Sequence, residues 1–409
     1  MLKILQINVI NKMASTGRTT MELGHEIEKA GMQSRIAVAI GEKEENVYLI
    51  GSKFEHKIHA ALSRIFGIQG YFSYCGTKRL LRYMDIEQPD VVHLRNLHGN
   101  YINLPMLFAY LRRNCIPTVI TLHDCWFFTG KCCHYTTIGC AKWLKGECKV
   151  CPKLRDDNVS WFFDYTSKMI RDKKRCIDGL KNNLTVVGVS QWIANEAKKS
   201  YVFSDVCNIE TIYNWIDESV FYPRQNVKIR ERLGLDNKFV ILSVASGWSN
   251  KKGLDKIRKI SSKLSHDMAI LLVGKCDEEI REKNIILVGE TKNVDELAEL
   301  YSTADVYLNM SLEESFGKVS AESLMCGTPV IAFDSTANPE IVGENCGYVI
   351  KNFNEKEIIT ILEKIKEKTK KSYTESCLVF ARENFSKTVN AKKYIDLYEK
   401  MVKTKGKTC

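Results

Sequence analysis

The stretch that decides the fold of this chain runs Glu313-Glu-Ser-Phe-Gly-Lys-Val-Ser-Ala-Glu-Ser-Leu-Met-Cys-Gly-Thr-Pro-Val-Ile331. With its flanking residues it predicts a strand at 306–310, a loop at 311–316, a helix at 317–326 closed by Gly327, and a strand at 330–333. The helix therefore begins at the carboxyl edge of a parallel sheet, where ligands bind. The N–H groups of a helix start beside a small residue such as Gly317 favour an anion such as a phosphate.

Two glutamates, Glu314 and Glu322, flank this helix start with seven residues between them. Glu322 falls on the same helix face as Val319, Met325 and Cys326, so it is predicted to point inward, where a carboxylate without a partner is costly. A polar ligand such as a ribose diol would satisfy it. A solvated glutamate on an amphipathic helix is the alternative that any single Glu leaves open.

The chain has 409 residues, enough for two domains of ordinary size. The sequence contains no run of eighteen apolar residues, and its first eight residues read as a strand too short and too polar for a signal peptide. The fifteen cysteines are odd in number and mostly scattered, which fits a reducing compartment better than a disulfide framework. We therefore predict a cytoplasmic protein.

The excess positive charge lies in the first half of the chain. Residues 1–200 hold 29 Lys and Arg against 18 Asp and Glu, whereas residues 201–409 hold 31 of each. A basic surface can meet nucleic acid, anionic lipid headgroups or phosphorylated substrates. In the segment 53–66, apolar residues recur at helical spacing beside Lys53, Lys57 and Arg64. This pattern is typical of a helix on an anionic membrane surface and, more commonly, of a helix packed on a core.

Short apolar runs alternate with helix-like segments along the chain, which predicts parallel strands with crossover helices. We place the junction between two domains in the polar, proline-terminated stretch 214–223. The predicted fold class is α/β, with two Rossmann-like, doubly wound domains at residues 1–213 and 214–384. The first domain carries a cysteine-rich insert at 125–152, and the segment 385–409 forms a C-terminal helix.

The string that begins at Glu314 resembles the Glu-x7-Glu signature of the retaining glycosyltransferases of family 4, which have the GT-B fold. There, Glu-x-Phe-Gly, the second Glu and Gly-x-Pro-Val-Ile recur in the same order as here. The resemblance implies that Glu314 faces the donor sugar and that Glu322 holds the nucleotide ribose. The backbone amides offered to the diphosphate would come from Phe316, Gly317 and Lys318.

The resemblance also covers the loop after the first strand of the second domain, with one departure. Lys252 matches a lysine that clamps the donor diphosphate in this family. The arginine of the family pattern falls on Ser246 or Gly247, so Lys251 is the residue that would replace the missing charge, without the bidentate fork of arginine. A solvated loop before a helix is the alternative interpretation of the two lysines.

Beyond the motif helix, the loop after the strand at 330–333 departs from the family pattern as well. Asn338-Pro-Glu340 matches the Pro-Glu of the family, but Ser335, Thr336 and Ala337 stand where glycines are usual. The resemblance therefore implies that this loop holds the donor differently here.

Three histidines and one glycine of the first domain are candidates for chemistry. His123 resembles the cleft histidine of the family, and its imidazole would hydrogen-bond the donor sugar or the acceptor, with Asp124 orienting it. His93 and His98 are weaker candidates, because a lone histidine beside a strand is more often a structural residue whose hydrogen bonds are satisfied. Gly17, before a first helix predicted from about residue 18, is either part of a ligand loop or a turn residue.

The cysteine cluster consists of Cys132, Cys140, Cys148 and Cys151. Cys148-x-x-Cys151 has the spacing of a metal knuckle, and two further thiols would complete a tetrahedral structural zinc site. Cys133 and His134 are alternative ligands from the same segment. Free thiols packed under a loop are the competing interpretation, and disulfides come third because of the compartment.

The resemblance implies two domains facing a cleft, with a saccharide or lipid-linked saccharide acceptor on the first and a UDP- or GDP-sugar donor on the second. The C-terminal helix would cross back to the first domain. Transfer of a hexose or related sugar would retain the anomeric configuration, as in the synthesis of capsule, exopolysaccharide or O-antigen. The sequence contains no Asp-x-Asp pair, so no catalytic metal is expected.

Four questions remain open at the level of the sequence. The protein is expected in the cytoplasm, with possible peripheral contact with the anionic inner face of the membrane. A nucleotide-sugar epimerase of the same fold is an alternative within the enzymes. A zinc-containing nucleic-acid-binding protein is an alternative from another functional class, but it leaves the Glu-x7-Glu string unexplained, so no nucleic-acid partner is predicted. The missing arginine and glycines also make an inactive relative conceivable.

Overall fold

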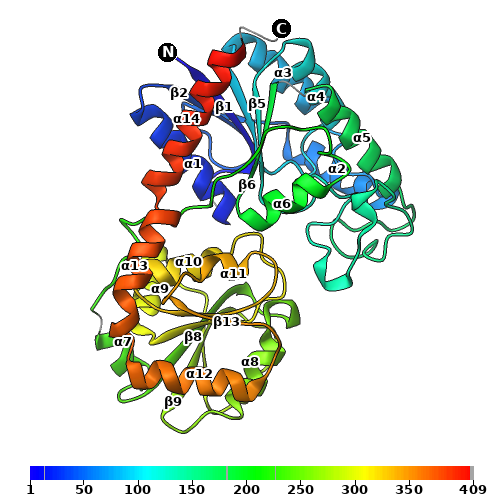
Figure 1. Cartoon of the computed structure of the whole chain (residues 1–409). Helices are drawn as coiled ribbons and strands as arrows, with labels where there is room; N and C mark the ends of the chain where they lie inside the picture. The colour runs from blue at the N-terminus through cyan, green and yellow to red at the C-terminus, as the bar shows by residue number, and fades with distance from the viewer. Residues whose placement is uncertain (13, 181–182, 226, 406–409) are drawn as a thin grey trace. The chain divides into compact units, whose positions relative to one another are not determined.

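The computed structural model describes residues 1–12, 14–180, 183–225 and 227–405. Contacts within the chain divide it into two compact units (Figure 1). The first unit comprises Met1–Ile212 together with the chain from Ala391 onward, and the second comprises Tyr213–Asn390. The linker predicted at 214–223 belongs to the second unit.

The first unit is built on a parallel sheet. Over the described residues its strand order is β3-β2-β1-β4-β5-β6-β7. The strands are β1 (Lys3–Ile10), β2 (Gln33–Ile40), β3 (Val47–Leu49), β4 (Val91–Leu94), β5 (Thr118–Leu122), β6 (Leu184–Gly188) and β7 (Ile209–Thr211). The order reverses direction between β1 and β4, which makes the carboxyl edge of these strands a place for ligands in a doubly wound fold.

Helices connect these strands and lie against the sheet. They are α1 (Ala14–Lys29), α2 (Lys53–Phe66), α3 (Tyr74–Glu87), α4 (Leu104–Arg113), α5 (Thr166–Asp178) and α6 (Gln191–Lys199). Capping residues fix the ends of helix α2. The hydroxyl of Ser52 accepts a hydrogen bond from the Glu55 amide at the start of α2, and Gly67 ends that helix with φ of 68°. The central strands β4, β5 and β6 are buried along their whole length, as expected for a sheet covered on both faces.

The second unit repeats the same plan. Over its described residues the strand order is β10-β9-β8-β11-β12-β13, all parallel. The strands are β8 (Phe239–Gly247), β9 (Met268–Lys275), β10 (Ile285–Gly289), β11 (Val306–Asn309), β12 (Val330–Phe333) and β13 (Gly347–Ile350). Its helices are α7 (Val227–Arg232), α8 (Leu254–Ser261), α9 (Val294–Thr303), α10 (Lys318–Met325), α11 (Asn338–Ile341), α12 (Glu355–Lys368) and α13 (Lys371–Phe385). Here the reversal falls between β8 and β11.

The prediction of two doubly wound, parallel α/β domains is confirmed. Some elements differ from the sequence-based expectation. The first helix begins at Ala14, four residues earlier than predicted. Strand β3 and helix α5 were not predicted. Helix α5 is rich in lysine, and Lys173 and Lys174 are buried on its inner face, so they interrupt the apolar period that would identify the helix.

The last helix, α14 (Lys387–Lys405), contributes to the core of the first unit. Tyr394 and Tyr398 are buried, and their hydroxyl groups lie 2.9 Å from Thr121 Oγ1 and 2.7 Å from His93 Nδ1. Residues 406–409 of the predicted C-terminal segment lie outside the described residues. Every helix in the described part of the chain is too short or too polar to cross a membrane.

The cysteine-rich segment connects β5 to α5. It consists of loops with two short 3-10 turns, Thr136–Ile138 and Lys142–Leu144, and Figure 1 shows it beside α2 and α5. A hydrogen bond of 2.8 Å from the Cys125 amide to the Cys133 carbonyl folds the start of this segment back on itself. As a result, residues near 133 return to the carboxyl edge of β5.

Candidate functional site

Two loops of the second unit meet at the carboxyl edge of neighbouring strands. One follows β8 and contains Lys251 and Lys252, and the other follows β11 and leads into α10. The Leu312 amide donates to the Lys251 carbonyl over 3.0 Å. Gly253, with φ of 81°, lies so close to the second loop that a Cβ would sit 2.4 Å from the Met310 carbonyl oxygen. The two loops therefore form one surface, and the glycine after Lys252 is required for their close approach.

An ion pair joins these loops. The Lys252 ammonium donates to the Glu314 carboxylate over 2.5 Å, and the two side chains retain 36% and 17% of their exposure. Both charged groups are therefore within reach of a ligand. The pair brings together a lysine and a glutamate that the sequence predicted as parts of a donor site.

The loop between β12 and α11 holds the backbone of Glu314. The Glu314 amide donates to Thr336 Oγ1 over 2.8 Å, and the Ala337 amide donates to the Glu314 carbonyl over 3.2 Å. Thr336 adopts φ of 53°, a left-handed conformation that favours glycine. The position where the family has a glycine thus keeps the glycine-like backbone, and the threonine hydroxyl adds a hydrogen bond to the loop of Glu314.

Helix α10 begins at this surface. Gly317 precedes it with φ of 84° and has no side chain to cap the first turn. The Phe316 ring is buried against Tyr213 and Phe385, with ring centroids 6.1 and 5.4 Å apart. Lys318 is the first helical residue and is partly exposed. Phe316 therefore anchors the turn from which α10 starts, four residues after Glu314.

Glu322 is buried on the inner face of α10, with 3% of its surface exposed. The Tyr301 hydroxyl donates to Glu322 Oε2 over 3.1 Å. Burial of the phenol, together with the neighbouring carboxylate, raises the pKa of Tyr301, so this hydroxyl keeps its proton and remains a donor. The inward orientation predicted for Glu322 from its helix face is observed.

A network of amide and hydroxyl side chains supports the loop between β11 and α10. Asn309 Nδ2 donates to Ser320 Oγ over 3.0 Å and to Asn338 Oδ1 over 3.2 Å. Asn338 Nδ2 donates in turn to the Ser311 carbonyl over 3.1 Å. Sequence reasoning noted Asn338 as part of a motif but missed Asn309 and Ser320. An asparagine at a strand end followed by a serine on the facing helix was the signal that could have found them.

Of the residues predicted to bind the donor or the acceptor, the first unit holds Gly17 and His123. Gly17 lies inside α1 rather than in a loop, and a Cβ there would sit 3.0 Å from the backbone carbon of Asn11. Its smallness therefore allows the helix to approach the end of β1. His123 is the first residue after β5 and is partly exposed. His93, by contrast, is buried with both ring nitrogens 2.7 Å from hydroxyl groups, those of Tyr398 and Thr121, which is a structural role.

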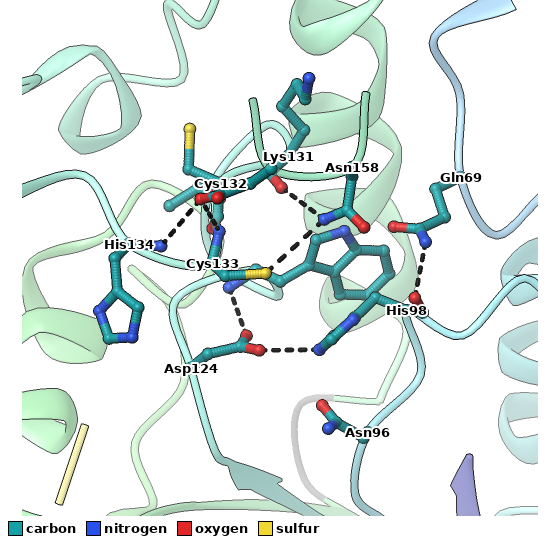
Figure 2. A network of polar contacts seen from close by, with 12 residues as sticks. Gln69, Asn96, His98, Asp124, Lys131, Cys132, Cys133, His134 and Asn158 are labelled. Carbon is teal, nitrogen blue, oxygen red and sulfur yellow. Dashed lines mark hydrogen bonds and ion pairs between the residues drawn. The ribbon is translucent and has the colours of Figure 1, made fainter. Parts of the chain in front are cut away.

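Asp124 pairs with His98 rather than serving His123 as the sequence suggested. Asp124 Oδ2 lies 2.7 Å from His98 Nε2, and Oδ1 accepts the Trp126 amide over 2.8 Å (Figure 2). Burial raises the pKa of Asp124, but the charge of His98 and the hydrogen bonds outweigh burial and lower it to about 2. For His98, burial acts to lower the pKa, but the charge of Asp124 outweighs burial, so the pKa of His98 is raised above its ordinary value. This ion pair was not predicted from the sequence.

The four predicted zinc ligands line one small cavity of about 20 Å³ beside Trp143 and Pro152: Cys132, Cys140, Cys148 and Cys151. A hydrogen bond from Cys132 lowers the pKa of the Cys151 thiol to about 7, whereas burial raises the pKa of Cys148 to about 11. Within the described residues, a different group of potential metal ligands converges. The ligand atoms of His98, Asp124 and Cys133 all lie within 4.8 Å of one another.

Comparison with known proteins identifies the family. Residues 16–220 match the family described as Glycosyltransferase Family 4, and residues 238–367 match the one described as Glycosyl transferases group 1. The first match alone spans about half of the chain. The chain therefore belongs to glycosyltransferase family 4, as its resemblance to that family predicted.

Two relatives illustrate the likeness. The chain is 28% identical over 176 residues to N-acetyl-alpha-D-glucosaminyl L-malate synthase of Bacillus anthracis, a match that covers 40% of this chain and 45% of that protein. It is 24% identical over 282 residues to the putative colanic acid biosynthesis glycosyl transferase WcaC of Escherichia coli, covering 67% of this chain and 66% of that protein. The chain thus spans about half to two thirds of the length of these relatives.

Solved structures show the same fold. A glycosyltransferase from Rickettsia africae superimposes with a TM-score of 0.67 at 16% identity, over 98% of this chain and 99% of that one. HepE of Anabaena, solved in complex with UDP-glucose, gives a TM-score of 0.65 at 15% identity, over 98% of this chain and all of that one. The fold is therefore GT-B, with two Rossmann-like domains.

Proposed function

We propose that this protein is a retaining glycosyltransferase that moves a hexose or a related sugar from a nucleotide-diphosphate sugar to a saccharide or lipid-linked acceptor in polysaccharide biosynthesis. The observation that carries the proposal is the Lys252–Glu314 ion pair, held by two bonded loops at the carboxyl edge of β8 and β11. This edge is where a doubly wound sheet binds its nucleotide. The HepE structure, with its UDP-glucose, supports a nucleotide-sugar donor of the UDP type.

The donor diphosphate would meet a prepared set of groups. Lys252 and Lys251 supply positive charge, and the amides of Phe316, Gly317 and Lys318 supply donors at the start of α10. When the diphosphate takes the Lys252 ammonium, Glu314 loses its partner and is free to orient the sugar. Glu322, held by Tyr301 from the inside, would accept the ribose hydroxyl groups. None of these roles requires a divalent cation, which agrees with the proposal of metal-independent transfer.

The acceptor side would belong to the first unit, where His123 follows β5 and Gly17 lies in the first turns of α1. His123 would hydrogen-bond the transferred sugar or the acceptor hydroxyl as a neutral imidazole. The likeness to the E. coli relative, a putative glycosyl transferase of colanic acid biosynthesis, supports a saccharide acceptor.

A structural zinc ion in the cysteine cluster is also part of the proposal, and it would have to draw the sulfur atoms of the cluster closer together, since they do not form a group within 4.8 Å of one another. The small cavity that Cys132, Cys140, Cys148 and Cys151 line is of the size that one water or one ion occupies. Four thiolates are a common ligand set of structural zinc. A bound ion would tie the loops of the segment together beside Trp143, without taking part in transfer.

Peripheral contact with an anionic membrane is supported by helix α2. Its apolar residues Phe54 and Ile58 are 74% and 44% exposed, next to Lys53 and Lys57. An apolar side chain beside cations suits the headgroup region of an anionic bilayer. Phe54→Asp should reduce sedimentation with phosphatidylglycerol vesicles, and equal sedimentation of the variant and the parent would contradict membrane contact through α2.

The decisive experiment combines donor binding with transfer. The full chain is screened by thermal shift against UDP-, GDP- and ADP-sugars, where a ligand at a hundredfold its dissociation constant adds about 2.7 kcal/mol of stability. The stabilising donor is then incubated with and without saccharide acceptors, and the product is examined by NMR. We expect transfer with the same anomeric configuration, and its loss in Lys252→Met. An isomerised donor sugar in the absence of acceptor would identify an epimerase instead.

A further inference from the structure

We propose that His98, Asp124 and Cys133 form a binding site for a zinc-like divalent transition metal ion, distinct from the cysteine cluster and from the donor site. One ligand atom from each residue lies within 4.8 Å of the other two. Figure 2 shows the imidazole and the carboxylate joined in one network, with the thiol in the same view.

The fold brings these three residues together from separate segments. His98 lies four residues after the end of β4, and Asp124 lies two residues after the end of β5. Because β4 and β5 are adjacent and parallel, their carboxyl ends lie side by side. Cys133 returns to this edge because its carbonyl accepts the Cys125 amide over 2.8 Å. Convergence of three potential ligands therefore follows from the sheet and from one loop closure.

The chemistry of the three ligand atoms indicates which class of ion would bind. Calcium and magnesium prefer oxygen ligands, whereas nitrogen, sulfur and one carboxylate oxygen suit zinc and similar ions. In a tetrahedral zinc site with metal–ligand distances of about 2.0 Å to nitrogen and oxygen, those two atoms lie about 3.3 Å apart. The present 2.7 Å between His98 Nε2 and Asp124 Oδ2 would need to open only slightly to admit the ion.

A proton relay is the obvious alternative for a cysteine, a histidine and an aspartate. In such a relay the imidazole stands between the thiol and the carboxylate, so that each binds a different ring nitrogen. Here the Cys133 sulfur and a carboxylate oxygen of Asp124 are within 4.8 Å of each other. Ligand atoms that converge on one point are the geometry of coordination, which favours the metal site.

Neighbouring groups already orient two of the ligands. The Trp126 amide holds Asp124 Oδ1, which leaves Oδ2 directed at His98. Asn158 Nδ2 lies 3.7 Å from Cys133 Sγ and also donates to the Lys131 carbonyl over 3.0 Å. Hydrogen bonds of this kind fix ligand orientation in metal sites, and their removal typically lowers metal affinity 10- to 100-fold.

Zinc content tests the proposal independently of glycosyl transfer. The full chain is stripped with a chelator and dialysed against zinc chloride, and bound zinc per chain is measured by mass spectrometry. Cys133→Ala is compared with the parent, and the same substitution is made in a Cys148→Ser background, which disables the cysteine cluster. We expect Cys133→Ala to remove one equivalent of zinc in both backgrounds. Equal zinc content with and without Cys133 in both backgrounds would overturn the proposal.

Two further variants guard against loss of fold. Asp124→Asn keeps an acceptor for the Trp126 amide and should lose the same equivalent of zinc. Asn158→Ala keeps all three ligands and should weaken zinc binding 10- to 100-fold. Circular dichroism of each stripped variant reports whether the fold is intact. Full zinc occupancy and parental zinc affinity in the folded Asp124→Asn variant would also contradict the proposed site.

Discussion

At the scale of single residues, the buried carboxylate of Glu322 carries much of the argument for a nucleotide site. Its side chain is almost fully buried, and the Tyr301 hydroxyl donates to one of its oxygens. A buried carboxylate is tolerated only where hydrogen-bond donors surround it. Ribose hydroxyl groups are donors of this kind, so a nucleotide would strengthen an arrangement that the protein has already prepared.

Substitution Glu322→Gln tests this role with little change of shape. The amide can still accept from Tyr301, but it loses the charge that strengthens hydrogen bonds from a ribose diol. Because a hydrogen bond to a charged group contributes about 1.5–3 kcal/mol, we expect donor affinity to fall about 10- to 100-fold. Isothermal titration with the donor found by thermal shift measures this. Glu363→Gln, on the exposed face of α12, is the matched control. Parental affinity in Glu322→Gln would remove the ribose assignment.

The candidate residues that stood out in the sequence differ in a physical way from those that did not. Glu314, Glu322 and Lys252 stand in local patterns, next to turns and helix starts that the chain itself encodes. Asn309 and the His98–Asp124 pair depend on which strands become neighbours, and that is decided by the whole sheet. The sequence showed these residues only as polar side chains at the ends of predicted strands, and it did not indicate which residues they would contact.

At the scale of elements, the start of α10 depends on the backbone of Gly317. With φ of 84° this residue turns the chain from the loop into the helix. A Cβ would find space there, since the nearest atom, Asn338 Oδ1, lies 3.5 Å away. The requirement for glycine is therefore conformational rather than steric.

Gly317→Ala should destabilise the protein by about 1–2 kcal/mol, the cost of a left-handed conformation for a residue with a Cβ. If the chain relaxes instead, the amides of the first turn move, and donor affinity falls. Urea unfolding and donor titration measure the two effects. Gly247→Ala is the control for stability, because that glycine is exposed, has no positive φ, and a Cβ there meets nothing within 4 Å. Equal stability and affinity in Gly317→Ala and the parent would contradict the role of this turn.

Helix α5 shows why one element escaped prediction. The Lys173 ammonium is buried, donates to the carbonyls of Trp126 and Thr129 over 2.5 and 3.0 Å, and lies 3.7 Å from the centre of the Trp126 ring. A lysine that serves as an internal hydrogen-bond donor looks like a surface residue in a sequence. The Lys173 side chain thus holds the loop after β5, and it interrupts the hydrophobic period that would have identified the helix.

At the scale of the whole molecule, the chain does not divide at a single point, because its last helix completes the first unit. Tyr398 is fully buried and binds His93, which stands 305 residues earlier in the chain. Tyr394 binds Thr121 in the same core. The two doubly wound units were predictable from alternating strands and helices. The partners of Tyr394 and Tyr398 were not, since nothing local distinguishes these two tyrosines from other aromatic residues on an amphipathic helix.

Tyr398→Phe therefore tests a connection between the end of the chain and strand β4. The substitution removes one hydroxyl and leaves a ring nitrogen of His93 buried without its partner, at a cost of about 1–3 kcal/mol. We expect amide hydrogen exchange to accelerate about 10- to 100-fold in β4 and β5, while β11 and β12 of the second unit keep their protection. Tyr74→Phe, an exposed tyrosine of α3 in the same unit, controls for loss of a hydroxyl. Exchange that accelerates equally in both units would mean that the final helix stabilises the chain as one cooperative body, and unchanged exchange in β4 would show that the His93–Tyr398 bond contributes nothing to the first unit.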